Sequence, residues 1–178
     1  MKTLTLLRHA KSSWADPGQN DFDRPLNPRG IAAARRMGSE MRALGLSFDA
    51  VLSSPARRAV ETLDRVAETY GPLTRAYDRR AYLAGSASLL AIARETDDAI
   101  GRLLLVGHNP GFHRLALLLT GNSGGPFNAE LAAKYPTGAL AEIELPIAHW
   151  RDLAEGRGRL TRFIRPRDLD PEIDPEED

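Results

Sequence analysis

The chain alternates short apolar runs with segments of helical periodicity, and this alternation constrains its fold more than any other feature. Apolar runs at residues 3–8, 48–52 and 102–106 each precede a segment whose apolar residues recur every three or four positions. The first run alternates threonine with leucine, and the third is continuously apolar from Leu103 to Val106, as in strands buried on both faces. The pattern predicts an α/β fold in which helices cover both faces of a mostly parallel sheet.

Capping and turn residues indicate where the first helix begins and ends. Asn27 followed by Pro28 predicts a helix start with Asn27 as the N-cap, and Gly45 predicts the end of that helix at about Leu44. The buried stripe expected for this helix consists of Ile31, Ala34, Met37, Met41 and Leu44.

The remaining elements are expected from the same signals. Ser54, as N-cap, and Pro55 predict a helix that extends to about Tyr70. Its inward residues are expected to be Ala59, Leu63, Val66 and Ala67. Further expectations are a weak strand at 73–77, a helix at 86–96 capped by Ser86 or Ser88, a helix from Asn109-Pro110 through Leu119, a flexible loop over 121–127, and strands at 139–145 and 160–164.

The domain organisation is expected to be simple. Residues 1–166 contain no internal repeat and no linker, so they are interpreted as one domain, and the acidic, proline-containing tail at 167–178 is expected to be disordered. The N-terminus has no apolar signal region, and no apolar run is as long as a membrane span. We therefore expect a cytoplasmic protein that has no membrane partner. The oligomeric state and the role of the tail stay open.

Composition excludes several kinds of chemistry and favours anionic ligands. The chain has no cysteine, which excludes disulfides, thiolate metal sites and cysteine nucleophiles. The net charge is zero, but the tail is acidic and the body is basic, and 21 of the 24 basic residues are arginine. Arginine favours phosphate because its planar guanidinium can bind two oxygens at once. No basic patch is interleaved with aromatic residues, so a nucleic-acid partner is not expected.

Three polar segments follow three of the predicted strands. Arg8-His9 ends the first strand, residues 54–58 follow the second, and Gly107-His108 ends the buried strand at 102–106. Because the carboxyl ends of parallel strands lie along one edge of a sheet, we expect these segments to converge there.

Together these segments supply two imidazoles and two permanent cations. Two guanidiniums, Arg8 and Arg58, can hold the oxygens of a phosphoryl group, which is most of what phosphoryl transfer requires of a protein. A neutral imidazole of His9 or His108 can attack phosphorus without an activating base, provided that its other ring nitrogen donates, for instance to a backbone carbonyl. The other imidazole can donate a hydrogen bond to the phosphoryl oxygens.

Three stretches of the chain resemble the signature segments of the histidine phosphatase superfamily, which has the phosphoglycerate mutase-like fold. They are Leu-Leu-Arg-His-Ala, Ser-Ser-Pro-Ala-Arg-Arg-Ala-Val-Glu-Thr and Leu-Val-Gly-His-Asn-Pro-Gly, and the resemblance extends over roughly residues 3–165. Arg-His-Ala-Lys-Ser-Ser-Trp, followed by Asp23-Arg24-Pro25-Leu26 and Arg29-Gly30, resembles the phosphohistidine phosphatase branch of the SixA type.

This resemblance implies a three-layer α/β/α sandwich and a covalent phosphohistidine intermediate on His9. Arg8, Arg58 and His108 would complete the phosphate pocket. Arg24 matches an arginine near the rim of that pocket, and Asn109 is a further candidate for substrate binding. No metal and no cofactor are implied, and inorganic phosphate would be the product.

The proton donor departs from the family pattern. Many members place a glutamate after the third strand to protonate the leaving oxygen, whereas Arg80 stands near that position here. Asp16, Asp21 and Asp23 remain candidate donors. Because a phosphohistidine needs less help from an acid than an alkyl phosphate does, the expected substrate is phosphohistidine on a protein. The alternatives are a broad small-molecule phosphomonoesterase of the same fold and a non-catalytic module that binds phosphate or a phosphoprotein.

Overall fold

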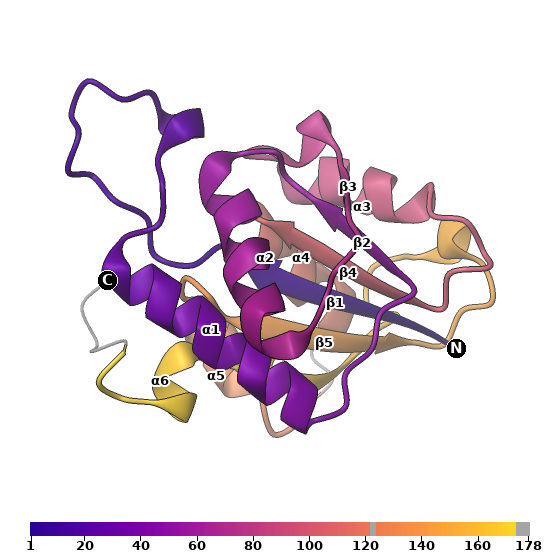
Figure 1. Ribbon diagram of the computed structural model, residues 1–178. Coiled ribbons are helices and arrows are strands. Elements are labelled where there is room, and N and C mark those ends of the chain that lie inside the picture. Colours follow the sequence, from indigo (N-terminus) through magenta and orange to yellow (C-terminus); the bar gives the residue numbers. More distant parts are fainter. Residues whose placement is uncertain (122–123, 174–178) are drawn as a thin grey trace.

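Figure 1 presents the computed structural model, which describes residues 1–121 and 124–173. The strands are β1 (Lys2–Arg8), β2 (Ala50–Ser53), β3 (Ala76–Tyr77), β4 (Arg102–Gly107), β5 (Leu140–Leu145) and β6 (Arg159–Ile164). The α-helices are α1 (Pro28–Ala43), α2 (Arg57–Tyr70), α3 (Ser86–Arg94), α4 (Gly111–Thr120), α5 (Asn128–Ala133) and α6 (Pro166–Leu169). Three short 3-10 helices are η1 (Asp21–Asp23), η2 (Arg79–Ala81) and η3 (Trp150–Asp152).

The strands form one six-stranded sheet in the order β3-β2-β4-β1-β5-β6. Strands β3, β2, β4 and β1 pair in parallel, and β5 is antiparallel to both of its neighbours. The predicted α/β fold with a mostly parallel sheet is therefore confirmed.

Each face of the sheet has its own apolar core, as in a three-layer sandwich. On one face, α1 and α2 bury residues such as Met37 and Leu63 against Leu7 of β1. On the other face, α3 and α4 bury residues such as Leu89 and Phe112. Figure 1 shows α1 and α2 in front of the sheet and α4 behind it.

The register of three adjacent strands brings the polar segments to one level. Arg8 of β1 is paired with Gly107 of β4, and Ser53 of β2 is paired with Val106. The backbone continues the pattern, because the His9 N–H donates to the Gly107 carbonyl at 3.0 Å and the Ser54 N–H donates to the Val106 carbonyl at 2.9 Å. His9, Ser54 and His108 therefore leave the sheet side by side.

The first helix begins and ends where the sequence predicts. The Asn27 side chain accepts from the Gly30 N–H at 2.8 Å, and Gly45 follows the helix with a φ of 67°. The predicted stripe is partly wrong, because Ile31 is half-buried and Leu44 is 37% exposed. Ala33 and the glycines at 30 and 38 are buried in this helix.

Two predicted caps are wrong. Helix α2 begins at Arg57 rather than Pro55, and its N-cap is Ala56, which makes no side-chain capping bond. Helix α3 has Gly85 at its N-cap position rather than Ser86 or Ser88. A serine close to a helix start can also form hydrogen bonds outside the helix. The Ser54 side chain contacts a residue of the candidate site.

The C-terminal part differs from the expectation in two places. Helix α5 was not predicted, and part of the predicted loop at 121–127 lies outside the described residues. The tail, predicted to be disordered, begins with α6, and Leu169 packs against the core beside α1. The rest of the tail at 174–178 lies outside the described residues.

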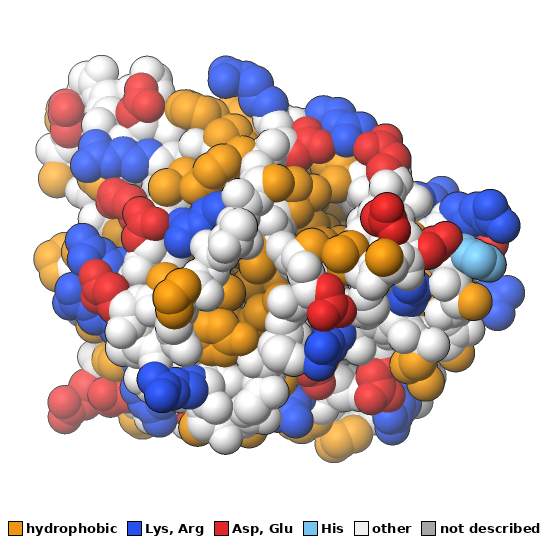
Figure 2. All heavy atoms as spheres, turned by 45° about the vertical axis from the view of Figure 1, so that its right-hand side comes forward, with side chains coloured by type: hydrophobic (Ala, Val, Ile, Leu, Met, Phe, Trp, Pro, Cys, Tyr) orange, Lys and Arg blue, Asp and Glu red, His pale blue; other side chains and the backbone are white. Residues whose placement is uncertain are grey.

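The surface charges are mostly paired rather than gathered. On the face shown in Figure 2, basic side chains lie among acidic ones. The exposed Arg80, for example, forms ion pairs with Asp78 and Glu95. Among the described helices, none has the length and apolar character that crossing a membrane requires.

Candidate active site

A pocket of about 240 Å³ lies where β1 and β4 end. Its floor, as we use the word here, consists of Arg8, His9, Arg58 and His108, the four residues that the sequence predicted to converge. Its rim consists of four residues from loops, Ser12, Trp14, Arg24 and Leu83. The predicted convergence is thus present in the structure.

His9 presents an unprotonated nitrogen. Its Nδ1 lies 2.7 Å from the Ala10 carbonyl oxygen, which can only accept, so Nδ1 carries the proton and Nε2 keeps its lone pair. The Ala10 N–H in turn donates to Thr62 Oγ1 on α2 at 2.9 Å, which fixes this segment. Burial lowers the pKa of His9 well below its ordinary value, and His108, Arg8 and Arg58 act in the same direction. The imidazole is therefore neutral at pH 7.

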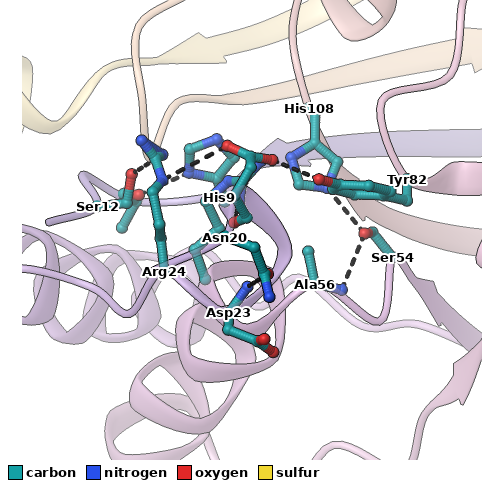
Figure 3. Close-up of polar contacts among 12 residues, drawn as sticks. His9, Ser12, Asn20, Asp23, Arg24, Ser54, Ala56, Tyr82 and His108 are labelled. Atoms are coloured by element: carbon teal, nitrogen blue, oxygen red, sulfur yellow. Dashed lines mark hydrogen bonds and ion pairs between the residues drawn. The ribbon is translucent and has the colours of Figure 1, made fainter. Parts of the chain in front are cut away.

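His108 presents a hydrogen-bond donor, whereas His9 presents an acceptor. Its ring centroid lies 5.2 Å from that of His9, and its Nε2 lies 2.8 Å from Ser54 Oγ (Figure 3). Ser54 Oγ already accepts from the Ala56 N–H, so its own proton is available to donate to Nε2. Burial, and then the charge of Arg58, lowers the pKa of His108 to about 3. A neutral His108 that accepts at Nε2 carries its proton on Nδ1, which is buried and has no hydrogen-bond partner.

Arg58 is held by the loop that follows β1. Its two terminal nitrogens donate to the Asp21 carbonyl oxygen at 2.7 Å and to Asp21 Oδ2 at 3.0 Å. The Tyr82 hydroxyl donates to the same carboxylate oxygen. Arg58 Nε is buried and has no hydrogen-bond partner. The guanidinium is therefore oriented from one side, and its Nε remains available for another acceptor.

Arg24 is buried in the rim. It is only 6% exposed, and its Nη2 donates to Ser12 Oγ, as Figure 3 shows. Its Nε lies 3.5 Å from Asp21 Oδ1, and neither Nε nor Nη1 has a hydrogen-bond partner. Buried donors on a permanent cation favour an anionic ligand.

Arg8 and Asn109 line the pocket beside the two histidines. Arg8 Nη1 donates to the Tyr135 carbonyl oxygen at 2.8 Å, and the Asn109 amide donates to the same oxygen at 2.9 Å. Asn109 Oδ1 also accepts from the His113 N–H at 3.2 Å. The structure therefore brings both predicted residues to the pocket and ties both to Tyr135.

Sequence and structure comparisons agree with this geometry. The family model described as the histidine phosphatase superfamily (branch 1) matches residues 4–81. An uncharacterized protein of Mycobacterium tuberculosis is 37% identical over 163 residues, which cover 90% of this chain and all of that protein. The chain belongs to the histidine phosphatase superfamily.

Solved structures place it in the SixA-type branch of that superfamily. A putative phosphohistidine phosphatase SixA from Agrobacterium tumefaciens is 31% identical, with a TM-score of 0.78 over 93% of this chain and 98% of that one. A second putative SixA, from Nakamurella multipartitia, is 26% identical, with a TM-score of 0.80 over 93% and 96% of the two chains. The phosphoglycerate mutase-like fold predicted from the sequence is confirmed, and the chain is a phosphatase by family.

The three candidate proton donors of this superfamily member lie in different places. Asp16 Oδ1 accepts from the Gly18 N–H in an exposed turn, and Asp23 lies in η1 at the loop end. Of the three, Asp21 alone reaches Arg58. Partial burial raises the pKa of Asp21, but the hydrogen bonds from Tyr82 and Arg58 outweigh it, so the pKa of the carboxyl is lowered. Asp21 is thus ionised at neutral pH and carries no proton to donate.

Two contacts of the site were not predicted. Ser54 was expected as a helix cap in a segment that converges on the site, but its contact with His108 was not predicted. The position of Ser54, directly after a strand that neighbours β4, was the signal that could have indicated this contact. No sequence pattern indicated that Tyr82 would reach Asp21 across 61 positions.

Proposed function

We propose that this phosphatase transfers a phosphoryl group to His9 and then to water, and that its substrate is phosphohistidine on a protein. In this proposal, residues 1–166 form the domain that carries the activity. Arg8, Arg58 and His108 bind the phosphoryl oxygens, with Arg24 and Asn109 as accessory contacts.

One observation carries the proposal. Buried donors without hydrogen-bond partners surround the same pocket: Nε of Arg58, Nε and Nη1 of Arg24, and Nδ1 of His108. Buried polar groups without partners are rare, and a set that lines one cavity favours a ligand that accepts from all of them. A phosphoryl group is such a ligand, and it would meet the lone pair of His9 in the same cavity.

In the first step, Nε2 of His9 attacks phosphorus. A bond forms between that nitrogen and phosphorus, and the bond between phosphorus and the substrate imidazole breaks. The electron pair of the broken bond stays on the departing nitrogen. When the other nitrogen of the substrate ring is protonated, the ring leaves as neutral imidazole and needs no acid from the protein. The His108 Nδ1–H and the guanidiniums stabilise the charge on the phosphoryl oxygens.

In the second step, water attacks the phosphorus bound to His9. The phosphorus–nitrogen bond breaks, both protons of the water stay on the released phosphate, and His9 regains its lone pair. The hydrogen bond from Nδ1 to the Ala10 carbonyl holds the ring in the same tautomer throughout. Both steps therefore proceed with groups that are already in position.

Asp21 acts in this scheme as an acceptor that orients Arg58. An alkyl phosphate releases an alkoxide, which needs a proton, and an ionised Asp21 cannot provide one. Arg80, which stands near the position of the glutamate found in other members, is engaged with Asp78 and Glu95. With Asp21 ionised and an arginine at the position of that glutamate, the site favours a phosphorus–nitrogen substrate over an alkyl ester.

The test is a substrate panel that compares the wild type with His9→Ala. A phosphorylated histidine protein, phosphoramidate, 3-phosphoglycerate and an alkyl phosphate are incubated with enzyme, and released phosphate is measured. The proposal expects turnover of the first two substrates, little turnover of the esters, and no turnover with His9→Ala. Equal or faster turnover of 3-phosphoglycerate would favour a broad phosphomonoesterase instead. Binding of the phosphoprotein without any release of phosphate would favour a non-catalytic module.

A further inference from the structure

Trp14 combines high exposure with a fixed position beside a buried cation. The side chain is 76% exposed, although it lines the same pocket as His9. Arg24, its neighbour in the rim, is only 6% exposed. Exposed tryptophans of single domains commonly contact a ligand or partner, because leaving so much apolar area in water forgoes the free energy of burial.

The indole ring rests on Arg24. The guanidinium carbon lies 3.4 Å from the ring centroid, which is the geometry of a cation–π contact. Arg24 is itself anchored by Ser12 Oγ and by Asp21. Because Arg24 covers one face of the ring and the side chain is mostly exposed, the other face is open to solvent.

The backbone on either side of Trp14 is also fixed. The Ser13 N–H donates to the Pro25 carbonyl at 2.8 Å, and Ser12 bridges to Leu26 in antiparallel fashion. The Ala15 N–H donates to Ser13 Oγ at 3.1 Å. Hydrogen bonds close the loop that carries Trp14, and Arg24 packs against the ring. The position of the ring is therefore fixed.

A second exposed apolar side chain, Leu83, lines the same pocket. It is 54% exposed, and its φ of 50° is the positive value that non-glycine residues rarely adopt. The pocket thus has a cationic floor and two apolar groups at its rim. Its volume is about 240 Å³. The space suits a phosphoryl group that carries a single flat ring.

We propose that Trp14 is the specificity-determining residue for the leaving group: its open face stacks on the imidazole ring of phosphohistidine while the floor holds the phosphoryl group. This inference rests on the proposed function and names the part of the substrate that the rim recognises. Leu83 contacts the edge of the same ring. Arg24 links the two halves of the site, because it lies under the indole and also presents donors to the pocket.

The experiment uses two substrates that share a phosphorus–nitrogen bond and differ in the ring. Phosphoimidazole carries the ring and phosphoramidate does not. The measured quantity is the ratio of their kcat/KM values for the full-length chain. Trp14→Ala is expected to lower this ratio by about threefold to tenfold, as the loss of one aromatic stack predicts. Trp14→Phe should retain most of the ratio, and Trp14→Leu, which is apolar but not planar, should not.

Two variants complete the design. Leu83→Ala should lower the ratio by a smaller factor, and Tyr77→Ala, which removes an exposed aromatic ring outside the pocket, should leave it unchanged. An unchanged ratio in Trp14→Ala would overturn the inference. This holds also when both kcat/KM values fall by the same factor, since Trp14 would then act only by shielding Arg24. The proposed function fails in a different way, namely when the wild type hydrolyses neither substrate.

Discussion

The floor and the rim of the pocket hold cations by different means. The floor residues lie at strand ends and at the start of α2, where the pairing of β1, β4 and β2 fixes their positions. The rim residues Ser12, Trp14 and Arg24 lie in the long loop after β1, and contacts among its own side chains hold it together. In the proposed function, the floor binds the phosphoryl group that all substrates share, whereas the rim contacts the part that differs from one substrate to another.

Replacing a guanidinium of the floor should have the largest effect. Arg58→Lys keeps the charge but loses the planar donors that face both Asp21 and the pocket, so kcat should fall by about a hundredfold or more. Steady-state kinetics with phosphoramidate measures this. Arg57→Lys is the matched control, because Arg57 is exposed and paired with Glu61. Similar kinetics for the two variants would contradict the assignment of Arg58 to the floor.

Removing Ser54 should have the next largest effect. Ser54→Ala takes away the donor to His108 Nε2, so that the neutral ring can move its proton away from the pocket. We expect kcat to fall by about tenfold to a hundredfold. The ¹⁵N shifts of His108 should change from a ring protonated at Nδ1 to one protonated at Nε2. Ser53→Ala serves as the control, and an unchanged tautomer in Ser54→Ala would show that Ser54 does not set it.

The carboxylate of Asp21, which holds Arg58, should matter less. Asp21→Asn keeps the shape of the side chain and removes its charge, and turnover of phosphoramidate should change by no more than about threefold. A general acid would instead contribute about a hundredfold or more. The measurement is kcat for phosphoramidate and for an alkyl phosphate. A hundredfold loss confined to the alkyl phosphate would identify Asp21 as the missing proton donor after all.

The smallest effect expected is on stability at acidic pH. Because the pKa of His108 is about 3 in the folded protein and near 6.5 when unfolded, the unfolded state binds more protons between these values. Stability is therefore lost as the pH falls below 6.5, by about 1 to 2 kcal/mol at pH 5 for this one group. Urea unfolding at pH 7 and pH 5 should show a smaller loss for His108→Asn than for the wild type.

The same contrast explains which features the sequence could predict. Arg8, His9 and His108 follow strands whose apolar pattern is clear, and parallel strands bring their ends together whatever lies between them. The helix beginning at Asn27 was equally clear, because a side-chain cap and a proline mark it. Each of these features follows from a local pattern, a strand or a cap, together with the general geometry of parallel sheets.

The features that could not be predicted depend on side-chain contacts that no local sequence pattern specifies. Serine is common at helix caps, so the sequence predicts Ser54 as a cap. It contacts His108 because β2 and β4, which precede these two residues, are neighbours in the sheet. Trp14 and Arg24 are ten positions apart in a loop without periodicity, so nothing in the pattern places one ring on the other cation. Asp21 could be named as one of three acids, but its lowered pKa follows from Tyr82 and Arg58.

The most direct test of the central claim is to trap the phosphoryl group on the enzyme. The wild type is mixed with excess phosphoramidate, quenched in alkali within one turnover, and digested for mass spectrometry. We predict an acid-labile, alkali-stable phosphoryl group on His9, absent from His9→Ala. A phosphoryl group on His108 or on an aspartate, or steady release of phosphate by His9→Ala, would contradict the account.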